Sequence, residues 1–143
     1  MIIEYKSCKN LPCDQLYRLF FAVGWVKENQ ATQEIKTTQE MMDHFNIGFL
    51  NSTFVFSAWD GDTLVGCVRV LSDLHFRSVI YDFAVLPQYQ RRGIGTELLK
   101  RCRSACRDSE WLVQTDTARK FYEIYGFQFN NDDFLTIPCK WFS

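Results

Sequence analysis

The chain has 143 residues, of which 47% are hydrophobic, and its formal net charge at pH 7 is −1. This size and composition can bury a sizeable core, so we expect a single domain over residues 1–143. The near-neutral charge argues against a nucleic-acid binder, and the first residues lead into no apolar run of signal-peptide or membrane-span length. We therefore expect a cytoplasmic protein with no nucleic-acid or membrane partner.

Hydrophobic spacing predicts two helices near the N-terminus. Residues 10–23 place apolar side chains on one face, with Pro12 in the first turn. Thr37 and Glu40 form a capping box that opens a second helix through Phe45. Both helices precede the strand-forming part of the chain.

The middle of the chain predicts a sheet. Residues 53–59 and 63–71 have strand-like patterns and are joined at Asp60-Gly61, a strong hairpin signal, so the sheet begins antiparallel. Residues 79–85 predict the next strand, and 111–114 a buried strand further on. The fold class is therefore α/β.

The C-terminal part predicts a helix and a hairpin. Asp116 or Thr117 could cap a helix that contains Phe121, and Gly126 would end it. The alternating residues 127–129 and 134–137 predict a final hairpin around a polar loop.

The run from Gln90 to Gly95, Gln-Arg-Arg-Gly-Ile-Gly, lies where a predicted strand turns into a predicted helix. Glycines there let backbone N–H groups converge on a phosphate, and the helix N-terminus adds a partial positive charge. From Gln90 to Arg107 six Lys and Arg residues stand against Glu97 alone. The segment therefore predicts a pyrophosphate cradle. A dinucleotide fingerprint would need a third small residue where Leu98 stands, and this disfavours that alternative.

The six cysteines lack Cys-x-x-Cys or zinc-ligand spacing, and the two histidines are distant from them in sequence. Cys102 and Cys106, four residues apart, could be taken for metal ligands, but they lie on the apolar face of the predicted helix with Ile94 and Leu98. We expect buried, reduced thiols and no metal.

The chain resembles the GNAT superfamily of acetyl-CoA-dependent N-acetyltransferases. The signature is Gln/Arg-x-x-Gly-x-Gly/Ala after a strand, which residues 90–95 match. A second element, residues 118–127, is similar to the family's pattern of Ala, then Phe-Tyr, then Gly-Phe. The resemblance is specific over Thr53 to Phe129. It implies a mixed sheet with antiparallel N-terminal strands, then a splayed parallel pair, and helices on both faces.

The resemblance also implies acetyl-CoA as the cosubstrate, with no metal. The cofactor site would be formed by the end of the predicted strand 79–85 and by the cradle segment after it, namely by Phe83, Val85, Gln90, Arg91, Arg92, Gly93, Ile94, Gly95 and Thr96. The backbone N–H near Phe83 would meet the thioester oxygen, and Val85 would bond the pantetheine arm. Thr115 stands where many relatives carry an Asn that bonds the cofactor.

Three catalytic candidates follow. Tyr122 matches the family's Tyr in the pattern Tyr-x-x-x-Gly-Phe and would be the acid that protonates the leaving thiolate. A phenol has a pKa of about 10 and a thiol one of about 8.5, so only a modest shift is needed for the phenol to donate. Its alternative role is a core aromatic. The base that deprotonates the amine is Asp82, His75 or a water relay, although strand alternation turns Asp82 away from Tyr81 and Phe83 unless a bulge intervenes.

The acceptor is expected to be a small primary amine. The chain resembles arylalkylamine-type members through Gly24-Trp25, Ser72-Asp73, Tyr81-Asp82 and Phe121-Tyr122. An apolar wall with Trp25 and Tyr81 would favour a compact aromatic or alkyl amine. The alternatives are acetylation of a protein N-terminus or lysine, and an acyl-CoA-binding domain without turnover. The sequence also leaves open whether the aromatic C-terminal end, Lys140-Trp141-Phe142, packs on a second subunit in a homodimer.

Overall fold

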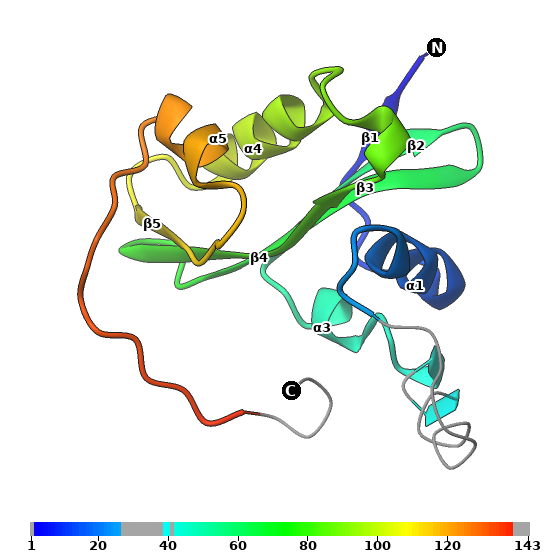
Figure 1. Cartoon of the computed structure of the whole chain (residues 1–143), viewed down its shortest axis with the longest axis horizontal. Helices are drawn as coiled ribbons and strands as arrows, with labels where there is room; N and C mark the ends of the chain where they lie inside the picture. Colours follow the sequence, from blue (N-terminus) through cyan, green and yellow to red (C-terminus); the bar gives the residue numbers. More distant parts are fainter. Residues whose placement is uncertain (1, 27–38, 41, 139–143) are drawn as a thin grey trace. The chain divides into compact units, whose positions relative to one another are not determined.

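The computed structural model describes residues 2–26, 39–40 and 42–138 (Figure 1). The chain divides into two compact units, Met1–Val113 and Gln114–Ser143, and each is described by itself. The capping box predicted at Thr37 lies outside the described residues. Residues 39–40 and 42–43 are helical, as predicted for that helix.

The first unit is built on a five-stranded sheet whose strands follow chain order, β1-β2-β3-β4-β5. The strands are β1 (Glu4–Lys6), β2 (Phe54–Asp60), β3 (Thr63–Ser72), β4 (Arg77–Val85) and β5 (Glu110–Val113). The first three pairings are antiparallel and β4–β5 is parallel. The predicted hairpin is confirmed: Asp60 pairs with Thr63, and Gly61 supplies the left-handed φ of +60° that the turn requires.

Helices lie on both faces of this sheet, as predicted (Figure 1). Besides the helical residues 39–40 and 42–43, the first unit contains α1 (Cys13–Ala22), α3 (Ile47–Leu50), the short 3-10 helix η1 (Pro87–Tyr89) and α4 (Ile94–Ala105). The first helix is shorter than the predicted 10–23, because Pro12 is its N-cap with an extended ψ of 129°. On one face lies α4, and on the other lie α1 and α3.

The core forms where the helices press on the sheet. Leu98, Leu99 and Cys102 of α4 are fully buried, as are Leu16 and Leu19 of α1. Burial of such side chains contributes about 1.5–3 kcal/mol each. Helix α4 lies so close to β3 that a Cβ on Gly66 would come within 3.2 Å of Leu98 Cδ1.

The thiols are free where the structure describes them, and their burial differs. Cys67 and Cys102 are buried, and burial raises the pKa of the Cys102 thiol to about 12. Cys106, expected on the buried face, is half-buried at the C-cap of α4, and Cys8 is exposed. The prediction of buried thiols is therefore wrong for Cys8, which lies in a surface segment after β1.

The second unit contains α5 (Arg119–Ile124). Gly126 follows it with a φ of +97°, so the predicted helix end is confirmed. The predicted cap is wrong: the N-cap is Ala118, whose N–H donates to Thr115 Oγ1 at 3.0 Å. The threonine three residues upstream takes the role expected of Asp116 or Thr117.

The predicted hairpin of residues 127–129 and 134–137 is also wrong, since no strand is present within 127–138. Phe129, Phe134 and Ile137 are exposed there. Alternating apolar residues form a strand only when a neighbouring strand takes their backbone hydrogen bonds, and alternation does not supply one.

Candidate active site

The predicted cradle connects β4 to α4. Arg91 and Gly93 both have left-handed backbones, with φ of +62° and +86°, and Gly93 is the N-cap of α4. No side chain caps the helix, and a Cβ at Gly93 would meet nothing within 4 Å. The backbone therefore opens the first turn of a 12-residue helix toward free space, the arrangement that suits an anion.

Side-chain contacts fix the cradle to the sheet. Gln90 Nε2 donates to the Val85 carbonyl at 2.9 Å, so this expected cofactor residue is held against the end of β4. Tyr89 donates its hydroxyl to Asp60 at 2.5 Å, a bond that raises the pKa of the phenol, and Arg92 lies 5.8 Å from the Tyr89 ring. Arg91 and Arg92 are exposed beside the open helix end.

A β-bulge lies in β4 at the expected thioester position. Cys67 pairs with Ala84 and Arg69 with Tyr81, so two β4 residues, Asp82 and Phe83, face the single β3 residue between them. Asp82 has a left-handed φ of +51°. The bulge that strand alternation alone could not reveal is therefore present.

Asp82 is held on both its backbone and its side chain. Its carboxylate accepts from Arg69 Nε at 2.6 Å, and its carbonyl accepts from Cys67 Sγ at 3.4 Å. Burial, with a smaller contribution from Asp82, raises the pKa of the Cys67 thiol well above its usual range. Cys67 is therefore a neutral donor at the bulge.

The strand carrying the bulge continues past its parallel neighbour. Pairing of β4 with β5 runs from Arg77 to Ile80, whereas β4 extends to Val85. Phe83 and Val85, expected to meet the thioester and the pantetheine arm, thus lie beyond the last β4–β5 pair. The order of antiparallel and then parallel pairing is the one that the sequence resemblance implied.

His75 lies in the exposed loop between β3 and β4. Its backbone N–H donates to Asp73 Oδ1 at 2.8 Å, and its ring contacts that of Phe76 at 4.3 Å. Asp73 Oδ1 also accepts from the N–H groups of Phe76 and Arg77. The His75 imidazole therefore lies on a loop whose backbone conformation is fixed by hydrogen bonds to Asp73.

A connected series of rings and one cation occupies the α1 and α3 side of the sheet. Trp25, 45% exposed, packs edge-on against Phe20, whose ring lies 6.3 Å from that of Phe49. Arg69 lies 5.8 Å from the Phe49 ring and 5.2 Å from that of Tyr81, itself 44% exposed. The two expected acceptor residues, Trp25 and Tyr81, are thus the exposed ends of one series.

Tyr122 and Thr115 belong to the second unit. Tyr122 is 6% exposed, and its ring lies 5.2 Å from that of Phe121 and 5.3 Å from that of Phe127. Thr115 bonds the N-terminus of α5, as described above. Within the first unit, the structure brings together Gln90 with Val85, and Asp82 with Tyr81 through Arg69.

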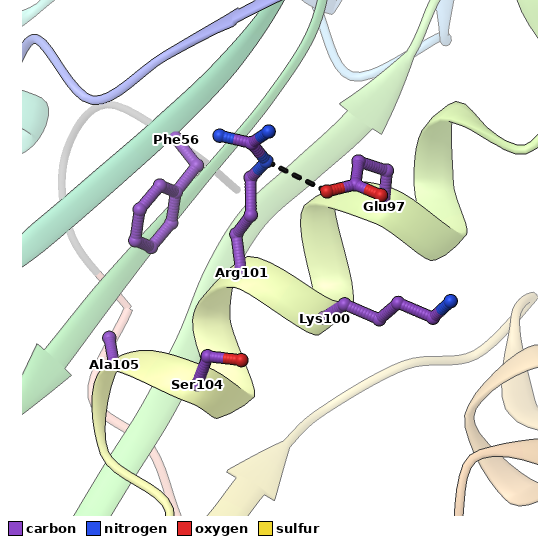
Figure 2. Close-up of a pocket in the computed structure, with 6 residues that line it drawn as sticks. All are labelled: Phe56, Glu97, Lys100, Arg101, Ser104 and Ala105. Carbon is purple, nitrogen blue, oxygen red and sulfur yellow. Dashed lines mark hydrogen bonds and ion pairs between the residues drawn. The ribbon is translucent and has the colours of Figure 1, made fainter.

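A groove of about 360 Å³ lies along the later turns of α4 (Figure 2). Phe56 of β2 forms its wall, Arg101 points toward Glu97 with a 2.9 Å ion pair, and Lys100 extends away from Phe56. None of the expected site residues lines this groove. It is therefore a surface separate from the cradle.

Arg69 is a residue of the candidate site that the sequence analysis missed. It is half-buried and is the one charged side chain between Leu64 and Leu71, in an otherwise apolar strand. A charge in such a strand requires a partner, which is the signal that could have found it.

Two further features of the described residues bear on the class of protein. They contain no group of three or more His, Cys, Asp or Glu that could hold a metal ion. None of their helices is both long and apolar enough to cross a membrane.

Comparison with known proteins identifies the class of protein that has this mixed sheet and this glycine turn at the start of α4. Residues 51–129 match the acetyltransferase (GNAT) domain family, so the chain belongs to the GNAT N-acetyltransferases. It is 28% identical over 130 residues to the uncharacterized N-acetyltransferase ycf52 of Porphyra purpurea, covering 87% of this chain and 70% of that protein.

Solved structures show the same fold. A protein of unknown function from methicillin-resistant Staphylococcus aureus superposes with a TM-score of 0.77 at 21% identity, over 97% of this chain and 99% of that one. A GNAT-family acetyltransferase from Streptococcus pneumoniae gives a TM-score of 0.70 at 25% identity, over 96% and 98%. The chain is therefore an acetyltransferase of a family that uses acetyl-CoA.

Proposed function

We propose that this enzyme transfers the acetyl group of acetyl-CoA to a small primary amine with an aromatic or alkyl body. The observation that carries the proposal is the open, left-handed Gly93 turn at the start of α4, in the connection that follows the end of β4. The first unit alone would thus supply both a site for the pyrophosphate and a strand end for the thioester arm.

The cradle residues fit the cofactor. The backbone of residues 91–96 would take the pyrophosphate, with Arg91 and Arg92 adding positive charge at its rim. Gln90 would act indirectly, by fixing the loop to Val85. Bound acetyl-CoA supplies a thioester, which an amine can attack.

The residues of β4 and α5 would serve the reaction. The Phe83 backbone N–H would stabilise negative charge on the thioester oxygen, and Val85 would bond the arm through its backbone. Tyr122 would donate a proton to the leaving thiolate. Thr115 is a further cofactor-binding candidate, although its hydroxyl already accepts from Ala118.

Alkylamines have pKa values of about 10, so the amine arrives protonated at neutral pH and must lose a proton before it attacks. Asp82, beside Arg69 in the bulge, His75 on its loop, and a water relay are the candidates for the base. The ion pair with Arg69 holds the Asp82 carboxylate in one place, and the Asp82 side chain is 32% exposed, so a substrate or a water molecule could reach it.

The exposed rings of Trp25 and Tyr81 support an apolar acceptor. Burying an aromatic ring against them would contribute about 2–3 kcal/mol. A protein N-terminus or lysine, and an acyl-CoA-binding role without turnover, are the alternatives. The proposal places the reaction in the cytoplasm and needs no metal, nucleic acid or membrane; a homodimer is compatible with it.

A thiol-release assay with acetyl-CoA tests the proposal. We expect kcat/KM for a phenylethylamine-type substrate to exceed that for an aminoglycoside and for a peptide N-terminus by tenfold or more. A tenfold preference for either of the latter would overturn the acceptor assignment. Tight acetyl-CoA binding without turnover across a broad amine panel would favour the binding domain instead.

A further inference from the structure

We infer that Arg69 is a positioning residue that holds the β4 bulge and the α3 segment in one arrangement, and so sets the acceptor side against the thioester strand. The inference rests on the proposed function. Arg69 lies on β3, so it contacts both structures from a strand in the middle of the sheet.

The first group of contacts joins Arg69 to the bulge. Its Nε donates to Asp82 Oδ2 at 2.6 Å, and its guanidinium lies 5.2 Å from the Tyr81 ring. Asp82 is one of the three described non-glycine residues with a positive φ. An Asp tolerates that conformation better than most residues, but the conformation still costs energy, and a charge-assisted bond to its carboxylate offsets it.

The second group of contacts joins Arg69 to α3 and to Ser52, two residues after its end. Nη1 donates to the Gly48 carbonyl at 3.5 Å and to Ser52 Oγ at 3.4 Å, and the guanidinium lies 5.8 Å from the Phe49 ring. A Cβ at Gly48 would come within 3.2 Å of Arg69 Cζ, so a larger residue at 48 would press on the guanidinium.

The geometry requires a guanidinium. Its planar fork donates in two directions while its faces contact rings, whereas a lysine ammonium is a point charge with neither the fork nor the plane. The bulge determines where the β4 backbone at Phe83 points, because Phe83 is its second residue. Loss of Arg69 should therefore misdirect the thioester strand and loosen the acceptor side, while leaving the cradle at residues 90–95 intact.

Arg69→Gln, Arg69→Lys and Arg69→Ala test the inference, with Arg77→Gln as the matched control. Arg77 also pairs with an acidic residue, Glu110, but at 3.6 Å and in an exposed position. We expect each Arg69 variant to lose tenfold or more in kcat and to raise KM for the amine, with KM for acetyl-CoA within about twofold of wild type. Arg77→Gln should keep wild-type kinetics.

A rescue experiment separates positioning from general destabilisation. Millimolar ethylguanidinium should restore at least part of the kcat of Arg69→Ala, and ethylammonium at the same concentration should not. An active wild type together with an unimpaired Arg69→Gln, or loss of kcat with no guanidinium rescue, would overturn the inference. An inactive wild type would instead count against the proposed function.

Discussion

At the scale of single residues, Tyr122 can be tested with little change in packing. Phenylalanine keeps the ring that contacts Phe121 and Phe127, and removes only the hydroxyl. We expect Tyr122→Phe to lower kcat by tenfold or more, the usual scale for a lost acid, with little change in acetyl-CoA affinity. Steady-state kinetics and cofactor titration on the same preparation measure both quantities.

The alternative role of Tyr122 has its own signature. If this side chain is only a core aromatic, Tyr122→Phe will keep its kcat, and Tyr122→Ala will lower the melting temperature. A folded Phe variant with wild-type kcat would remove Tyr122 from the mechanism.

Asp73 gives a prediction for acid stability. Backbone N–H bonds from Arg77, His75 and Phe76 hold the pKa of its carboxyl below the ordinary value of 3.8. A carboxyl with a lowered folded pKa stabilises the fold above its unfolded pKa, and this contribution is lost as the pH falls through the folded pKa. Asp73→Asn should therefore be less stable than wild type at neutral pH, and the difference should shrink below about pH 4.

Urea denaturation of wild type and Asp73→Asn at several values between pH 3 and pH 7 checks this. Asp62→Asn is a suitable control, because Asp62 is an exposed aspartate in the β2–β3 turn and not in the loop between β3 and β4. A stability difference that stays constant across the pH range would contradict the assignment.

At the scale of elements, local signals predicted well wherever short-range chemistry fixes the geometry. The turn at Gly61 and the end of α5 at Gly126 each need a left-handed residue, and the sequence supplies glycine. The bulge at Asp82 could not be predicted, because it depends on how β4 registers against β3. The partner of Arg69 could not be predicted for the same reason, because Asp82 is a residue of the bulge.

The failures in the second unit have a different cause. Residues 134–137 alternate like a strand, yet a strand is defined by its neighbour. The expected cap of α5 was also wrong. The hydroxyl of Thr115 accepts from the backbone N–H of Ala118, the N-cap residue, whereas Asp116 or Thr117 was expected to cap the helix. The hairpin and the helix cap both depend on which backbone groups come within hydrogen-bonding distance, and the spacing of residues in the sequence does not determine those pairings.

The start of α4 gives a prediction for this element. Gly93 has a φ of +86° with nothing within 4 Å of an added Cβ, so its substitution is strained only through the backbone. We expect Gly93→Ala to destabilise the fold by about 1–2 kcal/mol, and Gly93→Asn by less, since Asn visits this region more readily. Chemical denaturation of the two variants beside wild type measures both, and equal losses would contradict the backbone argument.

At the scale of the whole molecule, ligation should stabilise the protein. A ligand that binds only the folded state contributes RT ln(1 + [L]/Kd), or about 2.7 kcal/mol at a hundredfold excess over Kd. We expect acetyl-CoA to raise the melting temperature, and Gly95→Val to abolish that shift by blocking close approach to the backbone. A Val variant with the full shift would show that the cofactor lies elsewhere.

The close contact at Gly66 links the interior of the first unit to its ligand chemistry. A methyl group there would crowd Ile94 Cγ2 at 3.3 Å as well as Leu98, and Ile94 is the residue next to Gly93. Any displacement of α4 from β3 would carry the cradle with it. We therefore expect substitutions at Gly66, or on the inner face of α4, to change the affinity for the proposed cofactor while every surface residue stays as it is.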